Sequence, residues 1–410
     1  MNQSRNFYFN ILSILSSCLI PLLVTGPFLP DFLLSLMSLW FLYYSLKHKM
    51  YSIYYNPYFF AFIFFWLVCI LSSLLSDEIL FSLKSSIFYF RIGIFALLIS
   101  YLIDQNKKIL NYFYFSFLIT FSILILDGYF QYFTGSNVLG YKIIGPRTSS
   151  FFGDELIMGS YLVRLLPLLI ALFIVKENKQ IWEYYFFPVF LILVAILIFM
   201  AGERASLFFL IMFSLFLLCF LSCYKWMRIS IVIILFSLLS LLIIKNPKVK
   251  ARYFEETTQS MGANSSKKYF FTPEHDSLIR TAWSMFLDKP ILGHGPKLFR
   301  VKCKVYGNGR VNPCNTHPHN FYVQLLAETG IVGFSFLAGL FIYFFYLIVR
   351  HVFERIVRKH IWLSDYQICL LAGLLITIWP ITTNGSIFNN YLMILYGLQM
   401  GFFPKKEYKK

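Results

Sequence analysis

Charged residues are scarce in this sequence: only 13% of its 410 residues are Asp, Glu, Lys or Arg, against about a quarter in a typical soluble domain. Hydrophobic residues make up 58% of the chain and aromatic residues 20%. So few polar side chains cannot cover the apolar surface of a soluble globule, and lipid must therefore solvate most of the chain. The composition excludes an ordinary soluble enzyme and indicates an all-α integral membrane protein.

Acidic residues are the scarcer charged class, with 19 Asp and Glu against 36 Lys and Arg and a net charge of +17. Nucleic-acid-binding proteins also carry excess positive charge, but they concentrate it in a stripe with interleaved aromatic residues. No such stripe is present here, because most Lys and Arg residues lie in short stretches between apolar runs. Nucleic acid is therefore not an expected partner.

Several motifs of other enzyme classes are missing. The sequence contains no G-x-S-x-G elbow and no P-loop. It also lacks a pair of carboxylates placed as in a glycosidase. His275 and His294 could join other histidines around a metal ion, but no Cys or carboxylate lies at compact ligand spacing. We therefore predict neither a bound metal nor another cofactor.

Long apolar runs, by contrast, fill most of the chain. A helix needs about 20 largely apolar residues to cross the hydrocarbon core. Runs of this kind predict twelve spans, near 7–25, 27–45, 57–76, 85–103, 109–127, 156–175, 182–200, 205–223, 229–244, 321–349, 362–380 and 386–404. The predicted parts are spans one to nine with a longer outward loop at 128–155 (1–244), a large loop (245–320), spans ten to twelve (321–404) and a basic tail (405–410).

The distribution of Lys and Arg orients these spans, because basic residues in short loops favour the cytoplasm. Alternate connections carry basic residues such as Lys47, Lys107, Lys176 and Lys225, whereas the short connections between them are poor in Lys and Arg. Both termini are therefore predicted to be cytoplasmic. The 245–320 loop would face outward, which in a bacterium is the periplasm.

Cys303 and Cys314 differ from the other five cysteines, which lie in or beside apolar runs, because both lie in the polar 245–320 loop. Disulfides persist in the periplasm. The location favours a Cys303–Cys314 disulfide, with two unpaired thiols as the alternative.

Two outward segments each carry an arginine suited to chemistry. Arg204 lies in the tight 201–206 turn at membrane depth, where an unpaired guanidinium is unfavourable. Pairing with Glu203 or snorkelling to the interface is the alternative. Arg280 lies near the boundary of the apolar face of an amphipathic helix predicted over 276–289, where a solvated arginine is the alternative.

Two further segments follow. Residues 290–296 are rich in Gly and Pro and favour a structural turn. His317, His319 and Asn320 then stand directly before the apolar run that begins at Phe321. A neutral imidazole at that position can take a proton from a hydroxyl near pH 7.

Together, two arginines and a histidine on one face of the membrane suit a reaction of a lipid-linked diphosphate. Guanidinium groups match phosphate oxygens in a bidentate manner and stabilise the charge of a departing diphosphate. A histidine beside them can orient and deprotonate an attacking sugar hydroxyl.

The order and spacing of these residues resemble a known family signature. The run is Arg280…Trp283…Pro290-Ile-Leu-Gly-His-Gly-Pro, followed by His319-Asn-Phe-Tyr-Val-Gln-Leu-Leu-Ala-Glu328-Thr-Gly330. It is similar to the signature of the O-antigen ligase and O-antigen polymerase superfamily of inner-membrane glycosyltransferases. The twelve predicted spans and the large loop between spans nine and ten agree with that resemblance.

The resemblance implies roles for individual residues. Arg204, Arg280 and His319 would be the catalytic set, with the arginines on the diphosphate of an undecaprenyl-diphosphate-linked glycan and His319 on the acceptor hydroxyl. The acceptor would be a sugar of lipid A-core, and neither metal nor ATP would be needed. His317 could support or replace His319. His294 departs from the family pattern, which often has a small or variable residue there.

Three other arginines are candidates for substrate contacts, as is Asn320. Arg147 lies in the second extended outward loop, where it could contact a phosphate or a sugar. Arg91 and Arg164 lie within apolar runs, so they must face the bundle interior, a cavity or an internal partner. Asp154 and Glu155 are possible partners near the outward end, and structural pairing is the alternative role for both arginines.

Other functions stay open at this point. An O-antigen polymerase would use a second lipid-linked repeat unit as acceptor. Protein O-oligosaccharyltransferases share the motif but usually have a longer outward C-terminal region. A transporter of a charged lipid would be expected to show two related halves, and no internal repeat is evident. The oligomeric state cannot be deduced.

Overall fold

A computed structural model describes residues 2–260, 269 and 271–403 as an all-helical protein. Within these residues, β-structure is limited to two isolated bridges in the 135–157 loop. The elements are α1 (Asn2–Ser17), α2 (Leu19–Leu22), α3 (Phe28–Lys47), η1 (Tyr51–Tyr54), α4 (Pro57–Leu74), α5 (Ile79–Ser86), η2 (Ile87–Tyr89), α6 (Phe90–Gln105), α7 (Lys108–Thr134), η3 (Ser150–Phe152), α8 (Met158–Val175), α9 (Ile181–Met200), α10 (Arg204–Phe220), α11 (Lys225–Lys245), α12 (Pro247–Lys250), η4 (Ala251–Glu255), α13 (Glu256–Ser260), α14 (Pro273–Asp288), α15 (Phe299–Tyr306), α16 (Phe321–Val357), α17 (Asp365–Thr377) and α18 (Asn390–Phe402).

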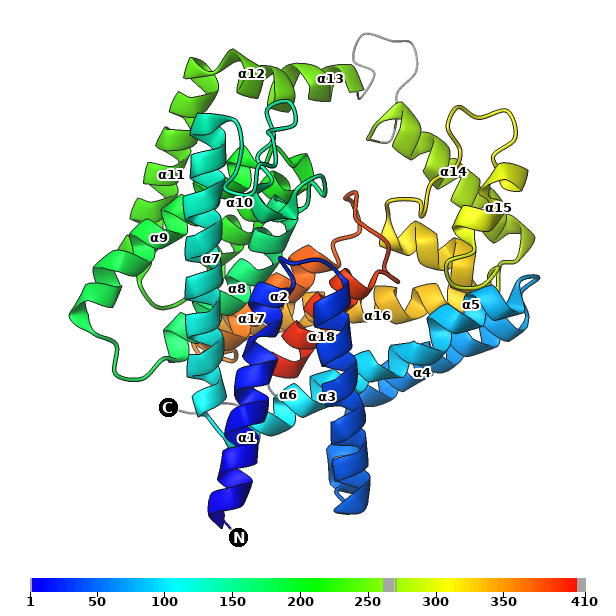
Figure 1. Cartoon of the computed structure of the whole chain (residues 1–410), viewed down its shortest axis with the longest axis horizontal. Coiled ribbons are helices and arrows are strands. Elements are labelled where there is room, and N and C mark those ends of the chain that lie inside the picture. Colours follow the sequence, from blue (N-terminus) through cyan, green and yellow to red (C-terminus); the bar gives the residue numbers. More distant parts are fainter. Residues whose placement is uncertain (1, 261–268, 270, 404–410) are drawn as a thin grey trace.

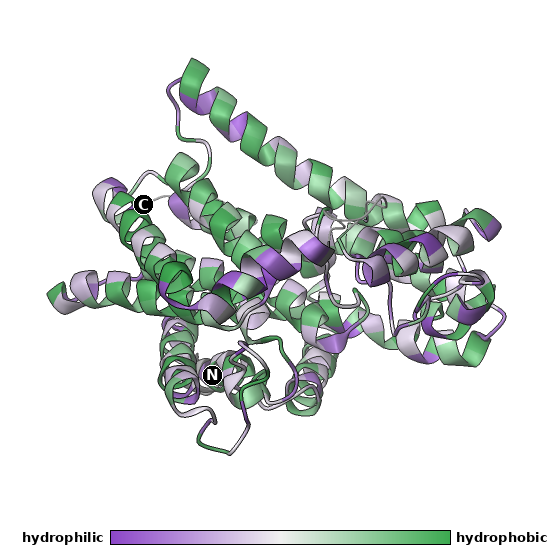
Figure 2. Cartoon of the chain, turned by 90° about the horizontal axis from the view of Figure 1, so that it is seen from above, coloured by the Kyte–Doolittle hydropathy of each residue, from purple (hydrophilic) through white to green (hydrophobic). Residues whose placement is uncertain are grey.

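Helices coincide with all twelve predicted apolar runs, which confirms the all-α membrane fold. In the described part of the chain, eight helical stretches are long and apolar enough to cross a membrane, and shorter apolar helices accompany them. Figure 2 shows that hydrophobic residues dominate the long helices. The predicted basic tail at 405–410 lies outside the described residues.

Helix ends follow local sequence signals. Asn56 caps α4 with its side-chain oxygen and is followed by Pro57 at the first helical position, where the missing N–H of proline has no consequence. Ser364 and Gln367 form a capping box at the start of α17. Gly135 ends α7 with a left-handed φ of 87°, a conformation that favours glycine.

The centre of the bundle is α8, which is buried on nearly all sides and packs against α17, α7, α9 and α10. A helix that is apolar all round belongs in such a core. In contrast, α11 buries little more than Leu235 and lies at the edge of the bundle (Figure 1). Its apolar surface therefore requires lipid.

The segment between α11 and α16 forms two parts, one along the top of the view in Figure 1 and one at its right. One part, α12 to α13, continues from α11, and the other consists of α14 and α15, which pack on each other and on α16. The loop between α17 and α18, residues 378–389, lies between the two parts in Figure 1. The candidate site residues lie around this loop.

A break in α16 joins the large loop to the bundle. Gly330 has φ 64° and ψ −167° in the middle of this helix, and a Cβ there would lie 2.2 Å from the carbonyl oxygen of Ile291. The turn-rich 290–296 segment lies in the break and pairs with it through backbone hydrogen bonds such as Gly295 N to Glu328 O (2.8 Å) and Ile331 N to Pro290 O (2.8 Å). The glycine-rich turn thus has a structural role, as its sequence favoured.

Candidate active site

Three histidine side chains lie together beside the 378–389 loop. The ring centroids of His317 and His319 are 4.2 Å apart, and those of His275 and His319 are 5.2 Å apart. His319 has φ 56°, and the next residue is the N-cap of α16. His275 lies in the first turn of α14, so the cluster joins two helix starts that are distant in the sequence.

Asn384 orients the two histidines that precede α16. Its backbone carbonyl accepts a hydrogen bond from His317 Nε2 at 3.2 Å, and its backbone N–H donates to His319 O at 2.8 Å. Asn315 Nδ2 lies 3.1 Å from His319 Nε2 and can donate to it, because the Asn315 oxygen already accepts from Thr316 N. In this arrangement Nε2 of His319 is the unprotonated nitrogen and its lone pair accepts the Asn315 hydrogen bond, so a substrate hydroxyl must replace Asn315 before Nε2 can act as a general base.

The imidazoles favour the neutral state. Burial is the main reason that the pKa of His275 falls to about 4 and that of His317 to about 3, and the neighbouring His319 lowers both further. Burial also lowers the pKa of His319 below its ordinary value. A cluster of this kind keeps unprotonated imidazole available at neutral pH.

A group of three arginines, Arg147, Arg204 and Arg252, surrounds the 201–205 turn. Arg204 is the first residue of α10. Arg147 Nε donates to Ala201 O at 3.3 Å, and Arg252 Nε donates to Gly202 O at 3.2 Å. The charge of Arg252 acts on Arg204, and the charge of Arg204 acts on His275. The arginine group is therefore close enough to the histidine cluster for its charge to act on His275, and it suits a polyanionic ligand.

Glu203 has a structural role beside these arginines. Its carboxylate accepts hydrogen bonds from Gly159 N at 2.7 Å, Ser160 N at 3.1 Å and Ser206 Oγ at 2.8 Å. The first two donors lie in the first turn of α8, where a carboxylate complements the helix dipole. From the sequence, Glu203 was a possible partner of Arg204. In the structure its carboxylate instead caps the start of α8.

Arg164 is 3% exposed and faces the bundle interior, as its place in an apolar run required. Its Nη2 donates to Asn384 Oδ1 at 2.7 Å, its Nη1 donates to Ser160 Oγ, and its guanidinium carbon lies 5.1 Å from the ring centre of Phe209. The predicted pairing of Arg164 with Asp154 or Glu155 is wrong. Polar and aromatic groups of α8, α10 and the 378–389 loop surround this guanidinium instead.

Arg91 also has an internal partner. It forms an ion pair with Asp31 at 2.7 Å and donates to Ser35 Oγ at 2.9 Å, and both partners belong to α3. Structural pairing, the alternative that the sequence left open, is thus present for this residue.

The contacts of Arg280 do not involve the histidine cluster. Its side chain is 64% exposed and forms an ion pair with Asp276 at 2.7 Å, one turn earlier in α14. In the described part of the chain, no contact joins Arg280 to His319 or Arg204. Its predicted catalytic role therefore stays a prediction.

Asn320 has a structural role in place of the predicted substrate contact. It is 4% exposed, and its oxygen accepts from Tyr322 N and Val323 N at the start of α16. Its amide nitrogen donates to Pro380 O at 2.8 Å and Thr382 O at 3.2 Å. Because these four bonds use the whole amide, Asn320 fixes the 378–389 loop against α16.

A disulfide joins Cys303 of α15 to Cys314, with Cα atoms 5.2 Å apart. Cys314 precedes His317 by three residues. The bond therefore fixes the start of the segment that carries both His317 and His319 to α15.

Sequence reasoning missed three residues of this site. His275 was considered only as a metal ligand, Arg252 was not singled out, and Asn384 was overlooked. The polar Thr-Thr-Asn-Gly run at 382–385, between two apolar runs, is the signal that could have drawn notice to Asn384. In the described residues, no group of three or more His, Cys, Asp or Glu side chains is arranged to hold a metal ion.

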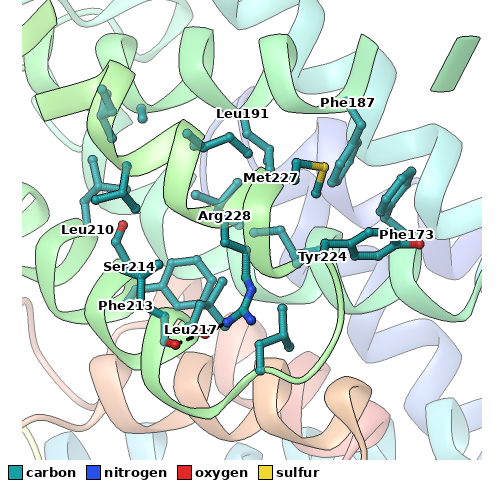
Figure 3. A pocket seen from close by; sticks show the side chains of 18 of the residues that line it. Phe173, Phe187, Leu191, Leu210, Phe213, Ser214, Leu217, Tyr224, Met227 and Arg228 are labelled. Carbon is teal, nitrogen blue, oxygen red and sulfur yellow. Dashed lines mark hydrogen bonds between the residues drawn. The ribbon is translucent and has the colours of Figure 1, made fainter. Parts of the chain in front are cut away.

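A separate apolar pocket lies between α8, α9, α10 and α11 (Figure 3). Arg228 is the arginine that lines it, and its Nη1 donates to the carbonyl oxygens of Leu217 and Leu218 at the end of α10. These bonds satisfy carbonyls at a helix C-terminus. Because this end of α10 is opposite to Arg204, the pocket is not part of the histidine site.

Comparison with known families decides the class of this site. The family model described as O-antigen ligase matches residues 189–338. Over these residues the chain is similar to the O-antigen ligase superfamily. The matched O-antigen ligase segment contains Arg204, the arginine-bearing α14 and both His317 and His319. The match supports a membrane enzyme of the glycosyltransferase type, with an activity of the O-antigen ligase or polymerase kind. No curated protein sequence matches the chain.

Proposed function

We propose that this O-antigen ligase homologue moves a glycan from undecaprenyl diphosphate to a sugar hydroxyl of lipid A-core. The observation that carries the proposal is a neutral histidine cluster on which the charge of Arg204, one of a group of three arginines, acts. A sugar hydroxyl requires a base, and a diphosphate leaving group requires fixed positive charge. The site offers both, and Arg204, Arg252 and the three histidines lie within the matched segment.

In the proposed reaction, Nε2 of His319 takes the proton of the acceptor hydroxyl. The hydroxyl oxygen attacks the anomeric carbon of the donor, and the bond from that carbon to the diphosphate oxygen breaks. The bonding electrons leave with undecaprenyl diphosphate, whose negative charge the guanidinium groups stabilise. Attack opposite the leaving group inverts the anomeric configuration.

His317 and His275 support the base in this mechanism. Each ring lies against His319. A second positive charge beside a protonated imidazole would be unfavourable. Neutral neighbours therefore allow His319 to gain the proton and then release it to solvent.

The proposed location is the bacterial inner membrane, with both termini in the cytoplasm and the site in the periplasm. The Lys and Arg content of the short loops supports this orientation. The Cys303–Cys314 disulfide supports an oxidising compartment on the side of the site.

The test is product formation by protein purified in detergent, with an undecaprenyl-diphosphate-linked glycan and lipid A-core. His319→Ala and Arg204→Ala should each lower the rate at least about 100-fold, since a general base or an oxyanion donor contributes about that much. His360→Ala is the matched control, because His360 is exposed and follows the C-terminal end of α16, whereas His319 precedes the start of that helix. Unchanged transfer by His319→Ala would reject the mechanism.

Deletion of the gene separates the ligase from its rivals. Loss of a ligase should leave bare lipid A-core and accumulated lipid-linked polymer. A core bearing a single repeat would instead identify an O-antigen polymerase, and a purified protein that forms no product from either acceptor would favour a transporter.

A further inference from the structure

A second cationic group lies on the other side of the histidines and is centred on Lys297. This residue follows the 290–296 turn and has φ 63°, a left-handed conformation that is unfavourable for a residue with a Cβ. Flanking contacts maintain it: Ser82 Oγ donates to Pro296 O at 3.1 Å, and Phe299 N donates to Glu328 Oε1 at 2.9 Å. Strain of this kind in a fixed backbone is characteristic of functional sites.

Lys297 and Arg300 differ from other basic residues of the same segment. Lys289 and Lys302 both bind Asp77, at 3.1 Å and 2.5 Å. In the part of the chain that the structure describes, neither the ammonium of Lys297 nor the guanidinium of Arg300 has a hydrogen-bond or ion-pair partner. These two cations are therefore available to a ligand.

Arg91 completes the second cationic group. The charges of Arg300 and Arg91 both act on Lys297, which is half-buried, and burial together with these charges lowers the pKa of Lys297. Asp31 and Glu328 offset part of this positive charge. Asp31 is already paired with Arg91, however, and Glu328 accepts from Phe299 N and Gln324 Nε2. Lys297 and Arg91 are half-buried and Arg300 is exposed, and the group has a net excess of positive charge, which an anion would balance.

The two cationic groups flank the histidine cluster. Arg204 acts electrostatically on His275, whereas Arg300 acts on His317. Figure 1 shows α10 and α15, which begin at or near these arginines, on opposite sides of the 378–389 loop. Glycan transfer needs two lipid substrates at once, one on each side of the base.

We propose that Lys297, Arg300 and Arg91 form a second anion site, which binds a phosphate group carried by the acceptor glycolipid. The inference rests on the proposed function. The three arginines around the 201–205 turn suit the diphosphate of the donor, because guanidinium forks match adjacent phosphate groups. The second group then fixes a separate phosphate, so that the acceptor hydroxyl faces His319 from the α15 side.

The test measures initial rates in phospholipid-free detergent, with each substrate varied in turn at saturating concentration of the other. We expect the Lys297→Gln/Arg300→Gln double variant to raise the KM for the acceptor about 10-fold or more and to leave the KM for the donor unchanged. Arg147→Gln should do the reverse. Lys302→Gln is the matched control, because Lys302 belongs to the same segment but is paired with Asp77.

A phosphatase-treated acceptor makes the test specific. For the unmodified enzyme, the KM for the dephosphorylated acceptor should be higher than that for the intact acceptor by about the same factor. For the double variant, removal of the phosphate should not raise the acceptor KM further. The inference would be overturned if removal of the phosphate raised the acceptor KM by the same factor in the unmodified enzyme and in the double variant. A phosphate preference that appears only when anionic phospholipid is added would also overturn it and would assign the site to a membrane headgroup.

Two results keep this inference separate from the proposed function. If the unmodified enzyme forms no product with either acceptor, the proposed function fails. If that enzyme is active but the variant has unchanged kinetics, only the second anion site is rejected. The single variant Arg300→Gln, at an exposed position, covers the case in which the double variant does not fold, and it should raise the acceptor KM in the same direction.

Discussion

Asn384 Oδ1 accepts a hydrogen bond of 2.7 Å from Arg164 Nη2, a guanidinium buried within the bundle. The backbone of the same asparagine holds His317 and His319. Arg164 therefore acts on the histidines through Asn384, and it is a positioning residue, with no need to touch a substrate.

The first prediction concerns Asn384. Replacement by Leu removes the acceptor of a buried charged donor, and we expect a loss of about 2 kcal/mol in stability. We also expect a rate at least about 10-fold lower, because the histidines lose their fixed orientation. Asn384→Asp keeps an oxygen for Arg164 and should restore most of the rate. Thr383→Ala is the neighbouring control, and equal losses in this control and in Asn384→Leu would argue against a positioning role.

The second prediction concerns pH. The pKa values of His275 and His317 in the folded protein, about 4 and about 3, lie below the ordinary value of about 6.5 in an unfolded chain. The unfolded chain thus binds protons first, and stability should be fully present above about pH 6.5 and fall progressively as the pH decreases towards 4. The melting temperature between pH 7 and 4 should decrease by several degrees, and less so in His275→Asn/His317→Asn. An equally steep decrease in that variant would contradict this assignment.

The third prediction separates the two readings of Arg280. If this arginine binds diphosphate, Arg280→Ala should lower transfer at least about 100-fold. Asp276→Ala, which removes its ion-pair partner, should retain transfer. Stability should change little in the Arg280→Ala variant, because the Arg280 side chain is exposed. Retained transfer by Arg280→Ala would restrict Arg280 to the ion pair with Asp276.

The fourth prediction concerns the Cys303–Cys314 disulfide. A bond across a loop of 11 residues stabilises a fold by about 3 kcal/mol in the chain-entropy description. Cys303→Ser/Cys314→Ser should therefore lower the melting temperature, and it should slow transfer, because the segment before His317 loses its tether. A reductant should slow the unmodified enzyme and leave the variant unaffected. Slowing of both proteins by the reductant would indicate a different target.

The sequence indicated the long helices of the bundle because each of them carries an apolar run, and it indicated His319 because that residue stands just before one. It could not indicate Asn384, whose partners lie 220 and 67 residues away. Pairings over such separations depend on how α8, α16 and the 378–389 loop meet in space. The partner of Arg91 in α3 was hidden for the same reason, whereas the disulfide followed from two nearby cysteines in one loop.

The 290–296 segment and the break at Gly330 are joined by four backbone hydrogen bonds, from His294 N, Gly295 N, Ile331 N and Val332 N. A lid that swings open over the site would have to break all of them in each turnover. The half of the large loop that holds α14 and α15 therefore behaves as a fixed wall, and in the proposed reaction both lipids would reach the histidines by lateral diffusion from the bilayer. An engineered cross-link between this wall and α16 should leave the turnover number unchanged.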